Sequence, residues 1–201
     1  MLYKSTVSES TFKLLEDLQS IDEFSKLRLV GGTALALLIG HRISVDLDLF
    51  GEVEFDSQLF NNFSKVQVIK KSNNINVFEI NDVKVDIVNY SYPWLDNELH
   101  IDNIRIASLK DIAAMKIAAV TGRGSKKDFV DLFFLLKEFS FSEIIKFYEQ
   151  KYSDASIYLA LKSLVYFDDA DNDPPLNMLI DIPWQKVKEN IKKEVISYSG
   201  V

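Results

Sequence analysis

The spacing of apolar residues divides the chain into two parts of different kind. In the first part, short alternating or continuous apolar stretches predict strands at 27–30, 45–50, 66–70, 75–80, 83–90 and 104–106. Helical spacing and glycine or serine boundaries predict helices at 8–24, 33–39 and 55–63. Asn81-Asp82 separates two of the strands and predicts a hairpin turn.

The second part lacks alternation and has the longer period of helices. Helices are expected after Ser108 and Ser125, which each precede an aspartate by three residues as in a capping box. The expected helical segments are 112–120, 129–139, 142–152, 153–166 and 184–198, with a surface loop at 168–175. The pattern predicts an α+β protein, with a mixed sheet and flanking helices over 1–107 and a helical bundle over 108–201.

The strand predicted at 45–50 carries two carboxylates on one face. Asp46 and Asp48 stand at positions i and i+2, so on an extended chain their side chains leave the same side, roughly 6.5 to 7 Å apart. Val45, Leu47 and Leu49 alternate with them and are expected on the buried side. Two acids on one face can share a metal ion.

A third acid lies on a later strand. Alternation over 83–90 places Asp86 on one face together with Lys84 and Val88. Three carboxylates that converge repel one another unless a cation is present, so such an arrangement favours a divalent metal. Oxygen ligands favour Mg²⁺ or Mn²⁺ over zinc. Gly31-Gly32 follows the first predicted strand, where the missing side chains would let a ligand approach the backbone closely.

Composition narrows the partners and the chemistry. The 201 residues carry a formal net charge of −7, which argues against a broad basic surface for duplex nucleic acid. The chain has no cysteine and two histidines, His41 and His100, so disulfides and thiolate metal sites are excluded and a histidine-built zinc site is not expected. The N-terminus does not resemble a signal peptide, and no apolar run approaches the roughly 20 residues of a membrane span. A cytoplasmic protein is expected.

These motifs together resemble a known family. Gly-Gly-Thr at 31–33, Gly-His-Arg at 40–42, Ser-Val-Asp-Leu-Asp-Leu-Phe at 44–50, Lys-Val-Asp at 84–86 and two blocks at 111–119 and 122–132 occur in that order. The sequence is similar to nucleotidyltransferases with the polymerase-β-like palm, and within them to the bacterial AbiEii/AbiGii toxin family. One departure is Gly-Gly-Thr where many nucleotidyltransferases have Gly-Ser, and Thr33 can supply the hydroxyl.

The resemblance implies a role for each motif. Asp46, Asp48 and Asp86 would hold Mg²⁺ or Mn²⁺, and Asp86 would also accept the proton of the attacking hydroxyl. The backbone N–H groups of Gly31, Gly32 and Thr33 would bind the β- and γ-phosphates of an NTP.

Lys116 would meet the triphosphate as a point charge, whereas the pattern alone would let this lysine reach solvent. Asp128 would orient Lys116 and also belongs to the capping box of Ser125, and Asp131 is interpreted as structural. The basic cluster of Arg123, Lys126 and Lys127 is a solvated helix start or a grip on phosphates of the nucleotide or of RNA.

Three functions fit this pattern. The first is a metal-dependent nucleotidyltransferase that acts as the toxin of a toxin–antitoxin or abortive-infection system, with tRNA or another RNA as acceptor and an antitoxin protein as partner. The second keeps the chemistry and transfers the nucleotide to a protein, as adenylylating antitoxins do. The third is a non-catalytic nucleotide- or partner-binding module of the same fold, against which the presence of all three acids argues.

Overall fold

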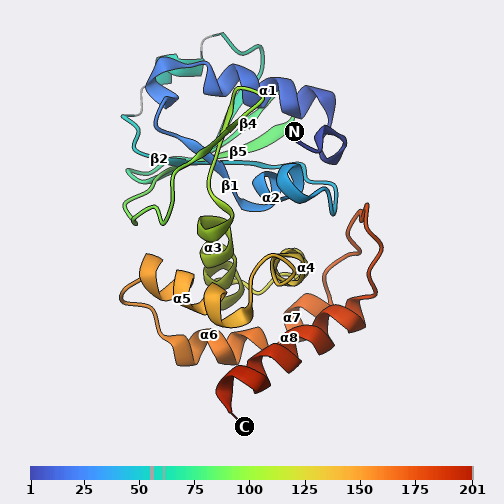
Figure 1. The fold of residues 1–201 in the computed structure, drawn as a ribbon. Coiled ribbons are helices and arrows are strands. Elements are labelled where there is room, and N and C mark those ends of the chain that lie inside the picture. Colours follow the sequence, from blue (N-terminus) through green and yellow to red (C-terminus); the bar gives the residue numbers. More distant parts are fainter. Residues whose placement is uncertain (55–56, 61, 201) are drawn as a thin grey trace. The chain divides into compact units, whose positions relative to one another are not determined.

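The computed structural model describes every residue except 55–56, 61 and 201 (Figure 1). Within the described part, the chain forms a seven-stranded mixed sheet with the strand order β3-β4-β5-β2-β1-β7-β6. The strands are β1 Arg28–Val30, β2 Leu47–Gly51, β3 Val66–Lys70, β4 Ile75–Ile80, β5 Val83–Asn89, β6 Leu99–Ile101 and β7 Ile104–Ile106. The α-helices are α1 Glu9–Gln19, α2 Gly31–Ile39, α3 Leu109–Gly122, α4 Lys126–Leu135, α5 Phe141–Lys151, α6 Ile157–Leu164, α7 Asp168–Asp171 and α8 Trp184–Ser199. Short 3₁₀ helices lie at η1 Lys4–Thr6, η2 Asp22–Phe24 and η3 Ser57–Phe60.

The chain divides into two compact units. The sheet unit comprises residues 1–92 and 97–107, and the helical unit comprises 93–96 and 108–201. In the sheet unit, α1 runs along one side of the strands (Figure 1), and its residues Leu15 and Leu18 are buried. The predicted α+β class, with a mixed sheet, flanking helices and a helical C-terminal part, is confirmed.

Local sequence signals explain most of the element boundaries. Ser8 caps α1 because its hydroxyl oxygen accepts the backbone N–H of Thr11 at 3.0 Å. Gly40 ends α2 in the left-handed conformation, with φ of 78°. Asn81 and Asp82 also have positive φ, as a tight hairpin between β4 and β5 requires.

Several boundaries differ from the sequence prediction. The first helix ends at Gln19, and α2 begins directly at Gly31 without a separate glycine turn before Thr33. Residues 99–101, for which the sequence predicts no strand, form β6, which pairs with β7 across a second positive-φ turn. The expected acidic loop at 168–175 contains the short helix α7. The helix predicted over 55–63 lies partly outside the described residues, and its described part contains η3.

Candidate active site

The two central acids of the sheet unit are neighbours in the sheet. β2 and β5 are parallel, and their register pairs Asp48 with Asp86. Neighbouring residues in register point to the same face, so both carboxylates lie on the face opposite Leu47, Leu49 and Ile87, which are fully buried. The pairing brings together two motifs 38 positions apart in the sequence.

Asp46 precedes β2 rather than lying within it. The predicted burial of Val45 is wrong, because this side chain is 64% exposed. The alternation that holds for Leu47 and Leu49 therefore begins only where β2 pairs with its neighbours. Thr33 holds this segment through its side chain, which is buried and hydrogen-bonded to the hydroxyl of Ser44 at 2.8 Å and to the backbone carbonyl of Asp46.

The two glycines leave space for functional side chains. Gly31 has φ of 71°, and a methyl group on its Cα would collide with the carboxylate of Asp48. A methyl group on Gly32 would collide with the guanidinium of Arg42. The first turn of α2 has unpaired backbone N–H groups and the positive end of the helix dipole, so this end of the helix suits an anion. The start of α2 therefore lies next to the carboxylate of Asp48 and the buried guanidinium of Arg42.

Lys84 is the cation of the acidic face. Its ammonium nitrogen lies 2.7 Å from Oδ1 of Asp86, an oxygen that is buried and accepts no well-aligned hydrogen bond from any described residue. Partial burial would lower the pKa of Lys84. The contact with Asp86 and the charges of Asp46 and Asp48 outweigh it and raise the pKa above the ordinary value. All three acids therefore act on this one lysine.

The donor set of this face fits a hard divalent cation. Carboxylate oxygens are the ligands that Mg²⁺ and Mn²⁺ prefer, and the register brings two of them together. Within the described residues, however, no three acidic or histidine side chains are already gathered around one point. The metal-ligand role of Asp46, Asp48 and Asp86 stays a prediction, and Lys84 lies where their negative charge is concentrated.

The helical unit holds the other predicted site residues in a separate network. Lys116 on α3 is buried, with its Nζ 3.1 Å from Oδ1 of Asp128 and 2.6 Å from Oδ2 of Asp131. The interpretation that this lysine reaches solvent is wrong, because its side chain is 4% exposed. Asp131, interpreted from the sequence as structural, is a direct partner of Lys116.

Asp128 is the centre of this network. Arg123 donates to both of its oxygens, at 2.8 and 3.0 Å, and the hydroxyl of Ser125 donates to Oδ2 at 2.6 Å. Ser125 is the N-cap residue of α4, but its hydroxyl bonds this carboxylate and does not cap a backbone N–H, so the predicted capping box is wrong in its hydrogen bonding. Asp128 thus holds Lys116, Arg123 and the start of α4 together.

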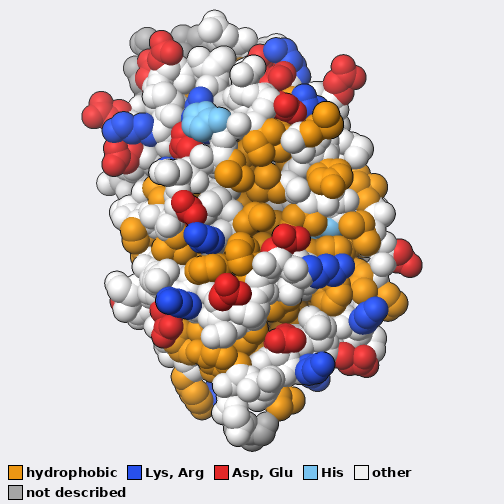
Figure 2. Space-filling view, viewed as in Figure 1, with side chains coloured by type: hydrophobic (Ala, Val, Ile, Leu, Met, Phe, Trp, Pro, Cys, Tyr) orange, Lys and Arg blue, Asp and Glu red, His pale blue; other side chains and the backbone are white. Residues whose placement is uncertain are grey.

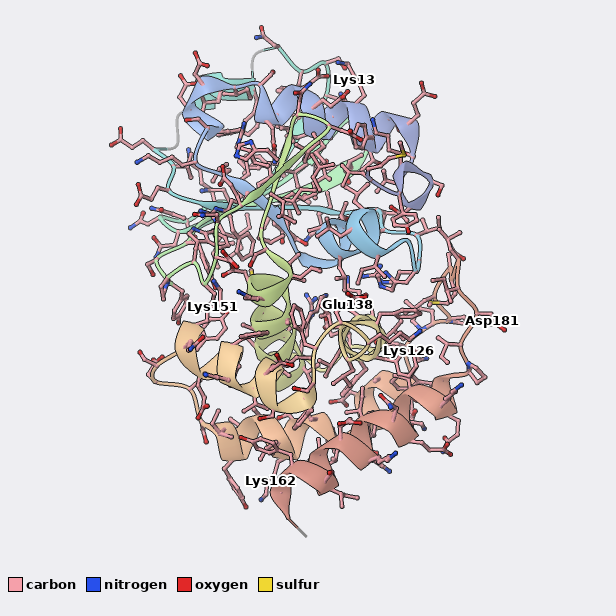
Figure 3. The ribbon with its side chains drawn as sticks, viewed as in Figure 1. Lys13, Lys126, Glu138, Lys151, Lys162 and Asp181 are labelled. Carbon is pink, nitrogen blue, oxygen red and sulfur yellow. The ribbon has the colours of Figure 1, made fainter. Side chains whose placement is uncertain are left out.

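The basic cluster beside this network is partly engaged in contacts within the protein. The backbone N–H of Lys126 donates to Asp173 at 2.7 Å, and its ammonium bonds the Asp173 carbonyl, so this lysine anchors the acidic segment (Figure 3). On the face shown in Figure 2, basic and acidic side chains alternate without forming one large basic surface. That mixture agrees with the net charge of −7.

The network predicts a specific loss of stability in acid. Burial would raise the pKa of Asp128, but Arg123, Lys116 and Ser125 hold it well below the ordinary value. Because the folded-state pKa is depressed, the stabilisation is present above the unfolded-state pKa of about 4 and is lost as pH falls below it.

Urea unfolding of wild type and Asp128→Asn between pH 7 and pH 3 tests this effect. The variant, already less stable at pH 7, should lose less of its remaining stability between pH 5 and pH 3. Equal pH slopes in the two proteins would contradict the role of this carboxylate.

Sequence reasoning missed two residues of the sheet unit. Arg42 lies against Gly32, and the signal available was its position in Gly-His-Arg beside a glycine pair. Lys84 was placed on the face of Asp86 by alternation, but its ion pair depends on the rotamer and on the register of β2 with β5. Arg42 and Lys84 thus add two cationic side chains to the sheet unit, one beside Gly32 and one beside Asp86.

The architecture is that of nucleotidyltransferases. A Helicobacter pylori protein described as a candidate nucleotidyltransferase superposes with a TM-score of 0.60 at 18% identity, covering 94% of each chain. MenT4, a nucleotidyltransferase toxin of Mycobacterium tuberculosis, superposes with a TM-score of 0.63 at 14% identity, covering 94% of this chain and 81% of its own. At these identities the likeness establishes the fold.

The sequence establishes the family. The family model for the nucleotidyl transferase AbiEii toxin of type IV toxin–antitoxin systems matches residues 13–197. The chain therefore belongs to the AbiEii nucleotidyltransferase toxin family, as the motifs predicted. A protein of Aquifex aeolicus strain VF5, described as uncharacterized, is 37% identical over 194 residues, which are 92% of this chain and 93% of that protein. The chain is a nucleotidyltransferase. None of the described helices is long and apolar enough to cross a membrane.

Proposed function

We propose that this nucleotidyltransferase moves a nucleotide from an NTP to an acceptor hydroxyl with Mg²⁺ or Mn²⁺ held by Asp46, Asp48 and Asp86. The observation that carries the proposal is the register of β2 and β5, which makes Asp48 and Asp86 neighbours on one face. Asp48 also lies against Gly31 at the start of α2. Carboxylates that hold a cation and backbone donors that hold an anion are what a metal–triphosphate complex requires.

The protein's own groups have separate tasks in this proposal. The acceptor hydroxyl attacks the α-phosphate of the NTP, the bond to the β-phosphate breaks and pyrophosphate leaves. Asp86 accepts the proton of the attacking hydroxyl, and the N–H groups of Gly31, Gly32 and Thr33 bind the β- and γ-phosphates. The bound cation supplies charge neutralisation of the phosphates and acidification of the hydroxyl. Arg42, whose guanidinium lies against Gly32, adds a positive charge to this end of α2.

In the helical unit, we propose for Lys116 and Arg123 the phosphate-binding role that the family resemblance implies. Asp128 orients both, since it accepts hydrogen bonds from each of them. Lys116 then acts from a fixed position, because two carboxylates hold its ammonium in a buried site.

We propose that the protein is the toxin of a bacterial toxin–antitoxin pair, that it works in the cytoplasm, and that its acceptor is RNA, with tRNA 3′ ends as the favoured substrate. Membership of the AbiEii toxin family supports the toxin role and a cognate antitoxin partner. The net negative charge of the chain favours a small contact area with RNA, because a large one requires many basic side chains. The 3′ end of an RNA strand needs only such a small contact.

The test is a transfer assay on the purified full chain. Incubation with total RNA and each labelled NTP in turn should label RNA in the presence of Mg²⁺ or Mn²⁺, and EDTA should abolish the label. A candidate antitoxin protein in a parallel reaction, read by intact mass, detects transfer to protein. Label that persists in EDTA would exclude the metal, and a mass increase without labelled RNA would exclude the RNA acceptor.

A further inference from the structure

The acidic face of the sheet unit carries a cation that belongs to the protein. Lys84 lies two residues before Asp86 on β5, on the same face, with its ammonium 2.7 Å from the Asp86 carboxylate. Asp46 and Asp48 also act electrostatically on this ammonium. Since Asp48 and Asp86 are neighbours in register, the positive charge lies among carboxylates that would otherwise repel one another.

We propose that Lys84 is the internal counter-ion of this face and that a divalent cation binds Asp46, Asp48 and Asp86 by displacing its ammonium group. The inference rests on the proposed function and adds a residue to it.

The side chain of Lys84 is able to leave. It is 45% exposed, whereas that of Asp86 is 23% exposed, so the ammonium can move to solvent without opening the core. Glu79 on β4 lies directly opposite Lys84 in register and offers the displaced ammonium a second carboxylate. A flexible four-carbon stem suits this exchange better than a planar guanidinium would.

Charge competition gives the expected effect on metal binding. The neutral side chain of Lys84→Met removes this positive charge, so a metal ion no longer has to displace an ammonium group and the local potential becomes more negative. The Mn²⁺ dissociation constant should fall by at least about tenfold, because even with the dielectric screening of water a unit positive charge about 4 Å from a divalent cation weakens its binding by this order.

Mn²⁺ binding to the full chain, measured from the electron paramagnetic resonance signal of free Mn²⁺, tests this effect. Lys84→Arg keeps the charge and should bind within about twofold of wild type. Lys65→Met is the matched control, because it removes the same charge from the exposed pair with Asp82 in the same unit and should leave the constant unchanged. Equal or weaker binding in Lys84→Met would overturn the proposal.

A second measurement needs no substitution. Acetylation of lysines with acetic anhydride, followed residue by residue by peptide mass, should label Lys84 severalfold faster after Mg²⁺ is added, because the displaced ammonium becomes accessible. Lys65 serves as the internal reference. Labelling of Lys84 that does not change with Mg²⁺ would overturn the displacement.

These readouts separate the inference from the proposed function. Tighter Mn²⁺ binding in Lys84→Met, with no transfer from any NTP by the wild-type protein, would support the counter-ion role of Lys84 and contradict the proposed reaction. Metal-dependent transfer by the wild-type protein, with unchanged Mn²⁺ binding in Lys84→Met, would support the proposed reaction and contradict the counter-ion role.

Discussion

Asp48→Asn should reduce nucleotidyl transfer by about a thousandfold or more while the protein stays folded. The amide keeps the shape of the side chain against Gly31. It removes the negative charge of Asp48, which would bind the cation together with its register neighbour Asp86. Removing one of two adjacent like charges relieves repulsion, so the melting temperature without metal should be unchanged or higher. Labelled-NTP transfer and circular dichroism melting measure the two quantities on the same preparations.

Asp17→Asn is the matched control for this variant. Asp17 forms an exposed pair with Lys13 on α1, at 2.9 Å, and its substitution should leave transfer at the wild-type level. If Asp48→Asn retained full transfer, the assignment of the acidic face as the catalytic metal site would be wrong. A large fall in its melting temperature would instead show that Asp48 supports the fold.

Lys151→Met should destabilise the helical unit by about 3–5 kcal/mol, as expected when one partner of a buried ion pair is removed. Lys151 (Figure 3) ends α5 with a fully buried side chain, and its ammonium donates to Asp111 at 2.7 Å and to the Pro93 carbonyl at 2.8 Å. Asp111 also accepts the backbone N–H of Leu95 at 2.9 Å. The pair therefore fastens segment 93–96 to the helices, and its loss leaves a buried carboxylate without its cation. Urea denaturation gives the free energy of unfolding.

A surface pair between α3 and the same segment 93–96 provides the comparison. Lys110 on α3 bonds Asp96 at 2.8 Å, with both side chains nearly half exposed. Lys110→Met should cost less than about 1 kcal/mol, because solvent screens an exposed pair. Similar decreases in the free energy of unfolding for Lys110→Met and Lys151→Met would contradict the claim that burial makes the Lys151–Asp111 pair more important for stability. The double variant Lys151→Met/Asp111→Asn should recover part of the loss, since no charge is then left unpaired.

Elements governed by local chemistry were predictable from the sequence. The glycine at the end of α2 and the Asn81-Asp82 hairpin are set by backbone conformations that few other residues adopt. Strand β6 was not predicted, because it has only three residues, centred on His100. So short a stretch shows too little alternation to be distinguished from the polar loop residues around it. Val45 is exposed, contrary to the prediction, because it precedes Leu47, the first residue of β2, and alternation determines the face of a side chain only within the paired strand.

The sequence by itself determined which chemistry this protein carries. Its motif order established the nucleotidyltransferase family, and period-two alternation placed Asp86 on the face of Lys84. Only the tertiary structure decided which charges meet. Register between β2 and β5 made Asp48 the neighbour of Asp86, and helix packing buried Lys116 between Asp128 and Asp131. The physical reason is that periodicity describes directions along one segment, whereas ion pairs form between segments and depend on how these segments pair and pack.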